Sequence, residues 1–130
     1  MSIYFVLALM LFCHVIDDYV LQAPCLCNLK QKSFWEQNEP EKLYKFDYIV
    51  ALLMHGLSWS FMIMLPIAIA LNFNVSAFFL IMFGFNTLFH AWIDDLKANQ
   101  KMINLWCDQF CHMAQIGGTF YAFLAGGFGC

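Results

Sequence analysis

Residues 47–71 read DYIVALLMHGLSWSFMIMLPIAIAL, and Asp47 and His55 are their only Asp, Glu, Lys, Arg or His side chains. A helix of this length, rising about 1.5 Å per residue, can cross about 30 Å of hydrocarbon. We therefore expect a transmembrane helix over 47–71. An ionisable group inside such a helix is costly and is by default a functional candidate, which singles out His55.

The rest of the chain is equally apolar. Of the 130 residues, 62% are hydrophobic and 12% are charged, and 15 are phenylalanine. A soluble domain of this size needs more polar surface, so the composition indicates an integral membrane protein in contact with a lipid bilayer. Three further runs, 2–23, 75–96 and 103–127, are also long enough to span. The sequence therefore predicts an all-α, four-helix transmembrane bundle in a single domain, 1–130, with no sign of nucleic-acid binding.

The lysines predict how this bundle is oriented. There is no arginine, and all six lysines lie in two connections, 24–46 and 97–102. The positive-inside rule places both connections in the cytoplasm and both termini outside. The first connection is polar, and we expect it to lie along the cytoplasmic interface with a short helix around 31–38. Pro24 is expected to end the first helix.

Three pairs of histidine and aspartate interrupt the apolar runs at a spacing of four residues, which puts both members of a pair on one helix face. The pairs are His14/Asp18, His90/Asp94 and Asp108/His112. With the predicted topology, the four histidines all lie roughly 9–14 Å below the cytoplasmic surface, and the three aspartates lie slightly nearer to it. Four helices are thus expected to bring four imidazoles and three carboxylates to a single layer.

Imidazole and carboxylate together are ligands of divalent metals. We expect a metal site formed by His14, Asp18, His55, His90, Asp94, Asp108 and His112. This set fits two ions joined by bridging carboxylates, or a single ion whose histidines are oriented by the carboxylates. Zinc is the first expectation, with manganese or iron as alternatives, and adjacent carboxylates argue against haem. The remaining alternative is that these groups only form hydrogen bonds between helices.

Three positions are candidates for catalysis. Asp17 lies three residues after His14 and is the candidate general base, with Asp108 as the alternative. Lys97, near the cytoplasmic rim, either holds an anionic group or extends to the lipid headgroups. Asp95 is expected to face away from the site.

The last span carries a stripe of small residues that would let another helix approach closely. Ala114, Gly118, Ala122 and Gly126 recur every four residues, roughly opposite the face of Asp108 and His112. They predict a homodimer contact or, equally, packing against a helix of the same chain.

Four blocks of this chain resemble those of an uncharacterised family of small bacterial and phage integral-membrane proteins, catalogued as domain of unknown function 3307. The blocks are HVIDDYVLQ (14–22), the isolated His55, HAWIDDLK (90–97) and DQFCH (108–112). They match in order and spacing over nearly the whole chain. The resemblance implies a bacterial inner-membrane location and a shared polar set: His14, Asp18, Gln22, His55, His90, Asp94, Lys97, Asp108, Gln109 and His112. Asp17 and Asp95 fall outside that set.

The family lends no established activity. A distant similarity to membrane-bound metal-dependent hydrolases favours hydrolysis at the cytoplasmic leaflet, with a phosphoester lipid or isoprenoid as the first substrate class to test. Transport or sensing of divalent metals or protons is one alternative. The other is a non-catalytic membrane interaction module with a structural metal.

Overall fold

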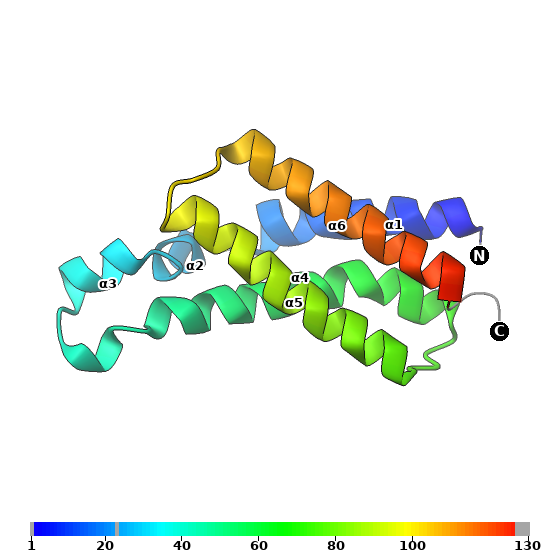
Figure 1. Cartoon of the computed structure of the whole chain (residues 1–130), viewed down its shortest axis with the longest axis horizontal. Coiled ribbons are helices and arrows are strands. Elements are labelled where there is room, and N and C mark those ends of the chain that lie inside the picture. The colour runs from blue at the N-terminus through cyan, green and yellow to red at the C-terminus, as the bar shows by residue number, and fades with distance from the viewer. Residues whose placement is uncertain (1, 23, 127–130) are drawn as a thin grey trace.

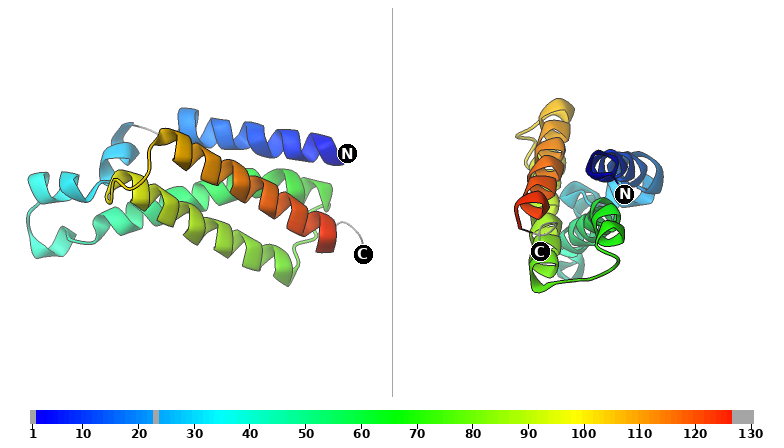
Figure 2. Two further views of the ribbon diagram at one scale, coloured as in Figure 1. Left: turned by 45° about the horizontal axis from the view of Figure 1, so that its top comes forward. Right: turned by 90° about the vertical axis from the view of Figure 1, so that its right-hand side faces the viewer.

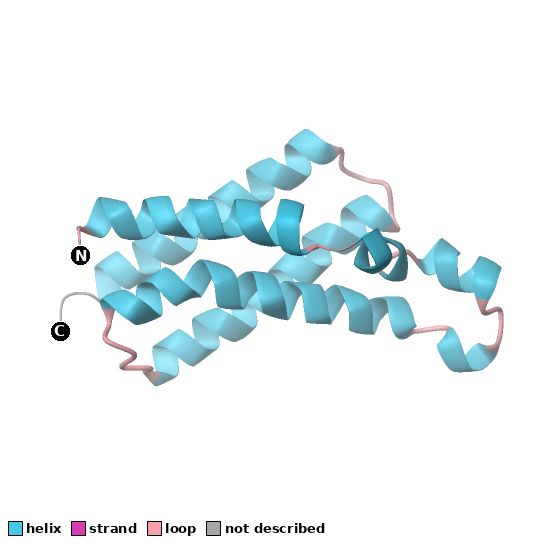
Figure 3. Cartoon of the chain, turned by 180° about the vertical axis from the view of Figure 1, so that it is seen from behind, coloured by secondary structure: helices cyan, strands magenta, loops and turns pink. Residues whose placement is uncertain are grey.

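A computed structural model describes residues 2–22 and 24–126, and every regular element in them is helical (Figures 1 and 3). Helix α1 spans Ile3–Ile16 and continues into a π-helical turn over Asp17–Leu21. Helices α2 (Pro24–Leu29) and α3 (Lys32–Asn38) are short, and a 3-10 turn follows at Lys42–Tyr44. The long helices α4, α5 and α6 span Asp47–Ala70, Ala77–Ala98 and Leu105–Gly126. The all-α prediction is confirmed.

The four long helices contact one another in a cycle. Helix α1 packs against α4, α4 against α5, α5 against α6, and α6 against α1. The end-on view in Figure 2 shows α1 beside α4 and α6 beside α5. The short helices α2 and α3 lie against α4 at one end of this arrangement. Each long helix therefore presents one face to a shared interior.

Three helical segments are long and apolar enough to cross a membrane. They are Ile3–Leu21, Lys42–Ala70 and Ala77–Ala98, which correspond to the predicted spans 2–23, 47–71 and 75–96. Helix α6 coincides with the fourth predicted span, 103–127, but does not reach the same apolarity among the described residues. The reason is its inner face, which carries the buried polar residues Asp108, His112, Gln115 and Thr119. Positions 23 and 127, at the edges of two predicted spans, lie outside the described residues.

The connections that carry the lysines lie at one end of the molecule, and the start of α1, the α4–α5 turn and the end of α6 lie at the other (Figure 1). Helix α3 falls where the short helix around 31–38 was expected. Pro24, however, begins α2 instead of ending the first helix, which already stops at Leu21. A proline is well tolerated in the first turn of a helix, where its missing N–H would have no partner anyway.

The apolar core and the polar interior occupy different halves of the helical cycle. Trp59, Ile63 and Ile67 of α4 are fully buried and pack with Met10 of α1 and Phe123 of α6, in the half nearer the termini. The buried ionisable residues gather toward the other half, and uncharged polar residues such as Asn86, Gln115 and Thr119 extend from them into the apolar core. Large apolar side chains are exposed on the outer faces, among them Phe12, Phe61, Leu88 and Phe110. Exposed apolar surface on this scale marks a molecule that faces lipid or partners.

Gly56 of α4 allows a close approach to α5. A Cβ atom built on Gly56 would lie 2.6 Å from the carbonyl oxygen of Thr87 and 3.4 Å from Ala91, both on α5. No real side chain fits at that distance from a backbone atom. The glycine therefore sets the spacing between the helices that carry His55 and His90.

Candidate metal centre

Four imidazoles meet inside the cycle of long helices. His14 comes from α1, His55 from α4, His90 from α5 and His112 from α6, and each residue is at most 2% exposed. The rings of His90 and His112 stack with centroids 4.3 Å apart, and the His55 ring lies 5.0 Å from that of His90. The His14 ring lies 5.8 Å from that of His112. We call these four residues the histidine cluster.

Carboxylates face this cluster at short range. Nε2 of His55 lies 3.5 Å from Oδ1 of Asp18 and 3.5 Å from Oδ2 of Asp94. The second oxygen of Asp94, Oδ1, lies 3.6 Å from Nε2 of His112 and 3.8 Å from Nε2 of His90. Asp94 therefore presents one oxygen to His55 and the other to the stacked pair. A carboxylate in this position can bridge two ligand sets.

These nitrogen–oxygen distances match those between neighbouring ligand atoms around a bound metal ion. Good hydrogen bonds between nitrogen and oxygen measure about 2.7–3.2 Å. Bonds of about 2.0–2.2 Å to a tetrahedral ion instead place neighbouring ligand atoms about 3.3–3.6 Å apart. Two overlapping groups of buried or half-buried side chains could hold an ion, with the ligand atoms of each group within 4.8 Å of one another: Asp18, His55 and His90, and His90, Asp94 and His112.

His90 is common to both groups, and its two ring nitrogens are buried without a hydrogen-bond partner in the described part of the chain. The two ring nitrogens of His112 are also buried and have no hydrogen-bond partner among the described residues. A buried polar atom without a partner costs about 1–3 kcal/mol. A cation bound to a ring lone pair would supply a partner, so the donor set fits a divalent metal.

His14 has a different environment, although the sequence places it among the metal ligands. Its Nδ1 accepts a hydrogen bond of 2.8 Å from the indole N–H of Trp59. This assigns the ring proton to Nε2, which lies 3.2 Å from Oε1 of Gln109. Both nitrogens are thus engaged, and His14 belongs to neither of the two groups. In this structure His14 lies at the edge of the histidine cluster, where it makes hydrogen bonds to Trp59 and Gln109 instead of completing a ligand group.

Replacing Trp59 with phenylalanine tests its hydrogen bond to His14. The Trp59 ring stacks on His90 with centroids 4.2 Å apart, and a phenylalanine ring keeps an aromatic surface there. The variant loses the N–H that pairs with His14 Nδ1 and also leaves a cavity, because phenylalanine is smaller than the fully buried tryptophan. Thermal unfolding in detergent should show a loss of about 1–3 kcal/mol from the unpaired nitrogen, with the cost of the cavity in addition. The matched variant Trp92→Phe changes an exposed indole on α5 and should stay within about 0.5 kcal/mol of the wild type. Equal stability of both variants would contradict the assigned role of Trp59.

A lysine from the first connection reaches into the site. Nζ of Lys30 lies 2.6 Å from Oδ2 of Asp94, and both side chains are less than 10% exposed. Asn99, just after α5, holds the backbone that carries this lysine. Its Nδ2 donates to the carbonyl of Lys30 over 3.1 Å, and its Oδ1 accepts from the N–H of Lys32 over 2.7 Å. Lys32 itself is exposed and pairs with Glu36.

Lys97 and Asp108 form the second ion pair of the site. Nζ of Lys97 lies 2.6 Å from Oδ2 of Asp108. The other oxygen of Asp108 lies 3.3 Å from Nε2 of His112. Gln109 donates to Asp108 over 3.2 Å and more weakly to Asp18 over 3.5 Å, so its amide connects the carboxylates to His14. Asp108 thus lies between an ammonium group and an imidazole.

The π-helical turn brings Asp17 inside as well as Asp18. Residues in a π turn are spaced more closely around the helix axis than in an α-helix, so two consecutive side chains can face the same interior. Asp17 is 1% exposed, and its Oδ1 accepts a hydrogen bond of 2.6 Å from Ser58. Its Oδ2 lies 3.6 Å from Nδ1 of His55. Asp17 therefore contacts His55 on the side opposite Asp18 and Asp94.

Charge balance gives independent support for a cation. Four carboxylates and two lysine ammonium groups leave a formal charge of −2 while the histidines are neutral; they are Asp17, Asp18, Asp94, Asp108, Lys30 and Lys97. Isolated charges are costly in a protein interior and are normally paired or bound to metals. One divalent ion or two protonated imidazoles would bring the cluster to neutrality.

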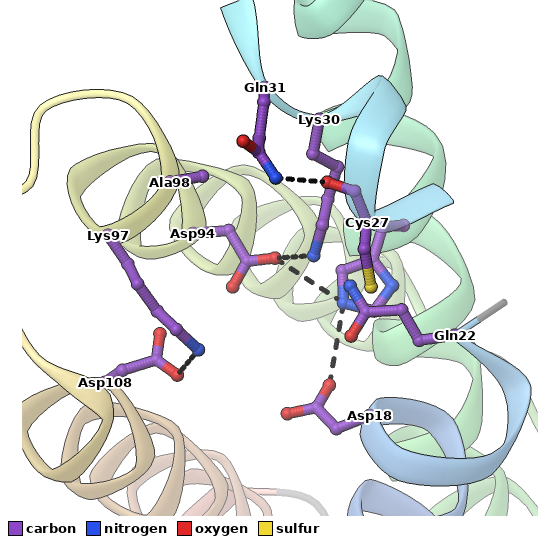
Figure 4. A pocket seen from close by; sticks show the side chains of 10 residues that line it. Asp18, Gln22, Cys27, Lys30, Gln31, Asp94, Lys97, Ala98 and Asp108 are labelled. Carbon is purple, nitrogen blue, oxygen red and sulfur yellow. Dashed lines mark hydrogen bonds and ion pairs between the residues drawn. The ribbon is translucent and has the colours of Figure 1, made fainter. Parts of the chain in front are cut away.

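A cavity of about 230 Å³ opens next to these groups, at the end of the molecule that carries the lysines (Figure 4). Figure 4 shows Lys30 reaching Asp94 from above, while Asp18 and Asp108 approach from the other side. The volume accommodates a small anionic group together with several waters of about 30 Å³ each. The residues that line it are Asp18, Gln22, Cys27, Lys30, Gln31, His55, Asp94, Lys97, Ala98 and Asp108.

Two residues of the site and one of its ion pairs escape the sequence argument. Trp59 lies four residues after His55 on the same face of α4, a spacing that could have revealed it. Ser58 gives no such signal, because its contact with Asp17 depends on how α1 packs against α4. The ion pair of Lys30 with Asp94 joins residues 64 positions apart, and no local pattern predicts it. Asp95 binds Asn99 and Gln100 outside the site.

Comparison of the chain with family models, curated proteins and solved structures finds no match. The function must therefore be argued from the site itself.

Proposed function

We propose that the protein is an intramembrane metal-dependent hydrolase that acts on a phosphoester lipid at the cytoplasmic leaflet. The observation that carries this proposal is that His90 belongs to both His/Asp groups, while its ring nitrogens have no hydrogen-bond partner among the described residues. These groups lie beside a cavity lined by lysines. A divalent ion in such a site acidifies a bound water and polarises the scissile group. The ion we expect is zinc, with manganese or iron as alternatives.

The membrane part of the proposal rests on the distribution of side chains. Helices α1, α4, α5 and α6 would form a four-helix transmembrane bundle, with polar groups inside and apolar groups facing lipid. The positive-inside rule orients the lysine-bearing end toward the cytoplasm. Helix α6 is the least apolar of the four, and its polar face is covered by the other helices. The resemblance to domain of unknown function 3307 belongs to this same proposal.

One ion fits the charge balance better than two, because the formal charge of −2 is cancelled by a single divalent cation. The two ligand groups also share His90, so an ion held by one group takes a ligand from the other. A second ion would have to rely on Asp94 as a bridge between His55 and His112. We therefore propose a single ion as the resting state and a second as the alternative.

The aspartates then have separable roles. Asp108 lines the cavity and contacts His112, so it is placed to accept a proton from an attacking water. Asp17 contacts His55 through Nδ1, which leaves Nε2 directed at Asp18 and Asp94. A carboxylate behind a histidine ligand fixes the orientation of the ring. We assign Asp17 this positioning role in place of the general base.

The lysines supply recognition of the substrate. Lys30 and Lys97 line the cavity, and each already holds a carboxylate over 2.6 Å. With a cation bound, the site would no longer carry excess negative charge, and the two ammonium groups could hold an anionic headgroup.

Substitution of Asp94 by asparagine tests the proposal. In proteoliposomes containing phosphatidic acid, wild-type protein should release phosphate, and Asp94→Asn should lower that rate about 100-fold or more, because the residue contacts both halves of the cluster. The matched control is Asp95→Asn, which changes the adjacent aspartate outside the site and should keep the wild-type rate. Undiminished turnover by Asp94→Asn would refute the proposal.

Transport and a purely structural metal are the alternatives. The polar interior continues past the histidine cluster through Asn86, Gln115 and Thr119. Beyond them Ile67, Phe79 and Phe123 fill the core, so no continuous polar route reaches the other end of the molecule. Metal uptake into proteoliposomes would favour transport. Tightly bound metal in a protein that does not hydrolyse lipid would favour a purely structural role for the metal.

A further inference from the structure

A second cavity lies along the outer side of the α5–α6 pair. It is a groove of about 460 Å³ whose exposed lining is almost entirely apolar. Its walls include Phe85 and Phe89 of α5 and Phe110 and Cys111 of α6, and Gly118 also lines it. We call it the α5–α6 groove.

The groove and the polar cavity are bounded by the same two helices. Lys97 on α5 and Asp108 on α6 line the polar cavity. Phe89 lies eight residues away along α5 and Cys111 three residues away along α6, about 12 Å and 5 Å at 1.5 Å per residue. The polar cavity at the lysine-bearing end is thus followed by an apolar groove that lies deeper along the helices.

We infer that the α5–α6 groove holds a hydrocarbon chain of the same lipid whose anionic headgroup occupies the polar cavity. This inference rests on the proposed function and adds to it the place where the hydrocarbon chain of the lipid binds. A methylene group takes up close to the volume of one water in the liquid, roughly 30 Å³, so the groove accommodates on the order of fifteen carbons. A chain attached to an anionic group near Lys97 needs to reach about 12 Å along α5 to meet Phe89 of the groove.

The shape of the groove favours a chain over a second copy of the protein. An α-helix with its side chains is about 10–12 Å wide. Phe85 and Phe110, which are 54% and 74% exposed, project from the two helices that border the groove. Gly118, which also lines the groove, leaves open space there, because a Cβ built on it would meet nothing within 4 Å. Open space beside bulky aromatic side chains suits a chain much thinner than a helix.

The chain offers a matched pair of glycines for the test. Gly118→Leu places a side chain in the groove, whereas Gly117→Leu makes the same change one residue earlier, outside the groove and equally free of contacts. Wild-type protein in nanodiscs containing phosphatidic acid with a diazirine in its acyl chain should be photolabelled on residues of the groove. Gly118→Leu should reduce that labelling about tenfold, and Gly117→Leu should leave it unchanged.

Turnover provides a second measurement. Gly118→Leu should slow hydrolysis of the long-chain lipid but not of a water-soluble phosphoester with the same headgroup. Labelling that is equal in all three proteins would overturn the inference. Crosslinked dimers through Gly118→Cys in native membranes would do the same, since a second copy would then occupy the groove.

The labelling does not depend on hydrolysis, so the two proposals can fail separately. Groove labelling that Gly118→Leu abolishes, without turnover of either substrate, would establish the chain site and refute the hydrolase. Turnover of both substrates that Gly118→Leu leaves unchanged would retain the hydrolase and refute the chain site.

Discussion

Protein purified in detergent with His90 replaced by alanine is expected to contain no bound metal. Wild-type protein should carry about one divalent ion per chain by elemental analysis, and the His90→Ala protein should fall to background. The physical reason is that His90 belongs to both ligand groups, so its loss leaves neither group with three ligands. No other residue of the cluster has this property.

The matched control is His14→Ala, which removes another buried histidine of the same cluster. His14 is already engaged by Trp59 and Gln109, so this variant should retain most of its metal even if it is less stable. Loss of metal in both variants would show that His14 is a ligand, as the sequence pattern suggests. Metal retained in His90→Ala, or absent from the wild type, would remove the basis of the metal centre.

Gly56→Ala is expected to destabilise the protein by about 1–3 kcal/mol, the cost of forcing extra atoms into a packed interior. The new Cβ would lie 2.6 Å from the backbone oxygen of Thr87, so α4 and α5 would have to move apart. That movement separates His55 from His90, and metal affinity should fall along with stability. Thermal unfolding in detergent and metal titration measure the two effects.

The control for this variant is Gly84→Ala on α5. A Cβ on Gly84 meets nothing within 4 Å, so alanine should be neutral or stabilise the helix by up to about 1 kcal/mol. If Gly56→Ala behaves like Gly84→Ala, the close approach of α4 and α5 does not set the geometry of the site.

Much of the fold follows from the apolar runs. The predicted runs 2–23, 47–71 and 75–96 match apolar helical segments within a few residues. A long apolar stretch with few charges is best satisfied as a helix, which pairs its backbone polar groups within itself. The fourth run, 103–127, matches α6 in position, although α6 is less apolar than the other three. The end of the first helix was harder to predict, since Pro24 is compatible both with a stop and with the start of α2.

Residue spacing identified most of the ionisable side chains of the site, because residues four apart share a helix face and the apolar runs place the pairs at similar depth. Their partners and roles follow from tertiary packing. Packing of α1 against α4 places His14 within hydrogen-bond distance of Trp59 and Asp17 within hydrogen-bond distance of Ser58. Folding of the first connection over α5 brought Lys30 to Asp94. These contacts join helices far apart in the chain, and helical periodicity carries no information about which faces meet.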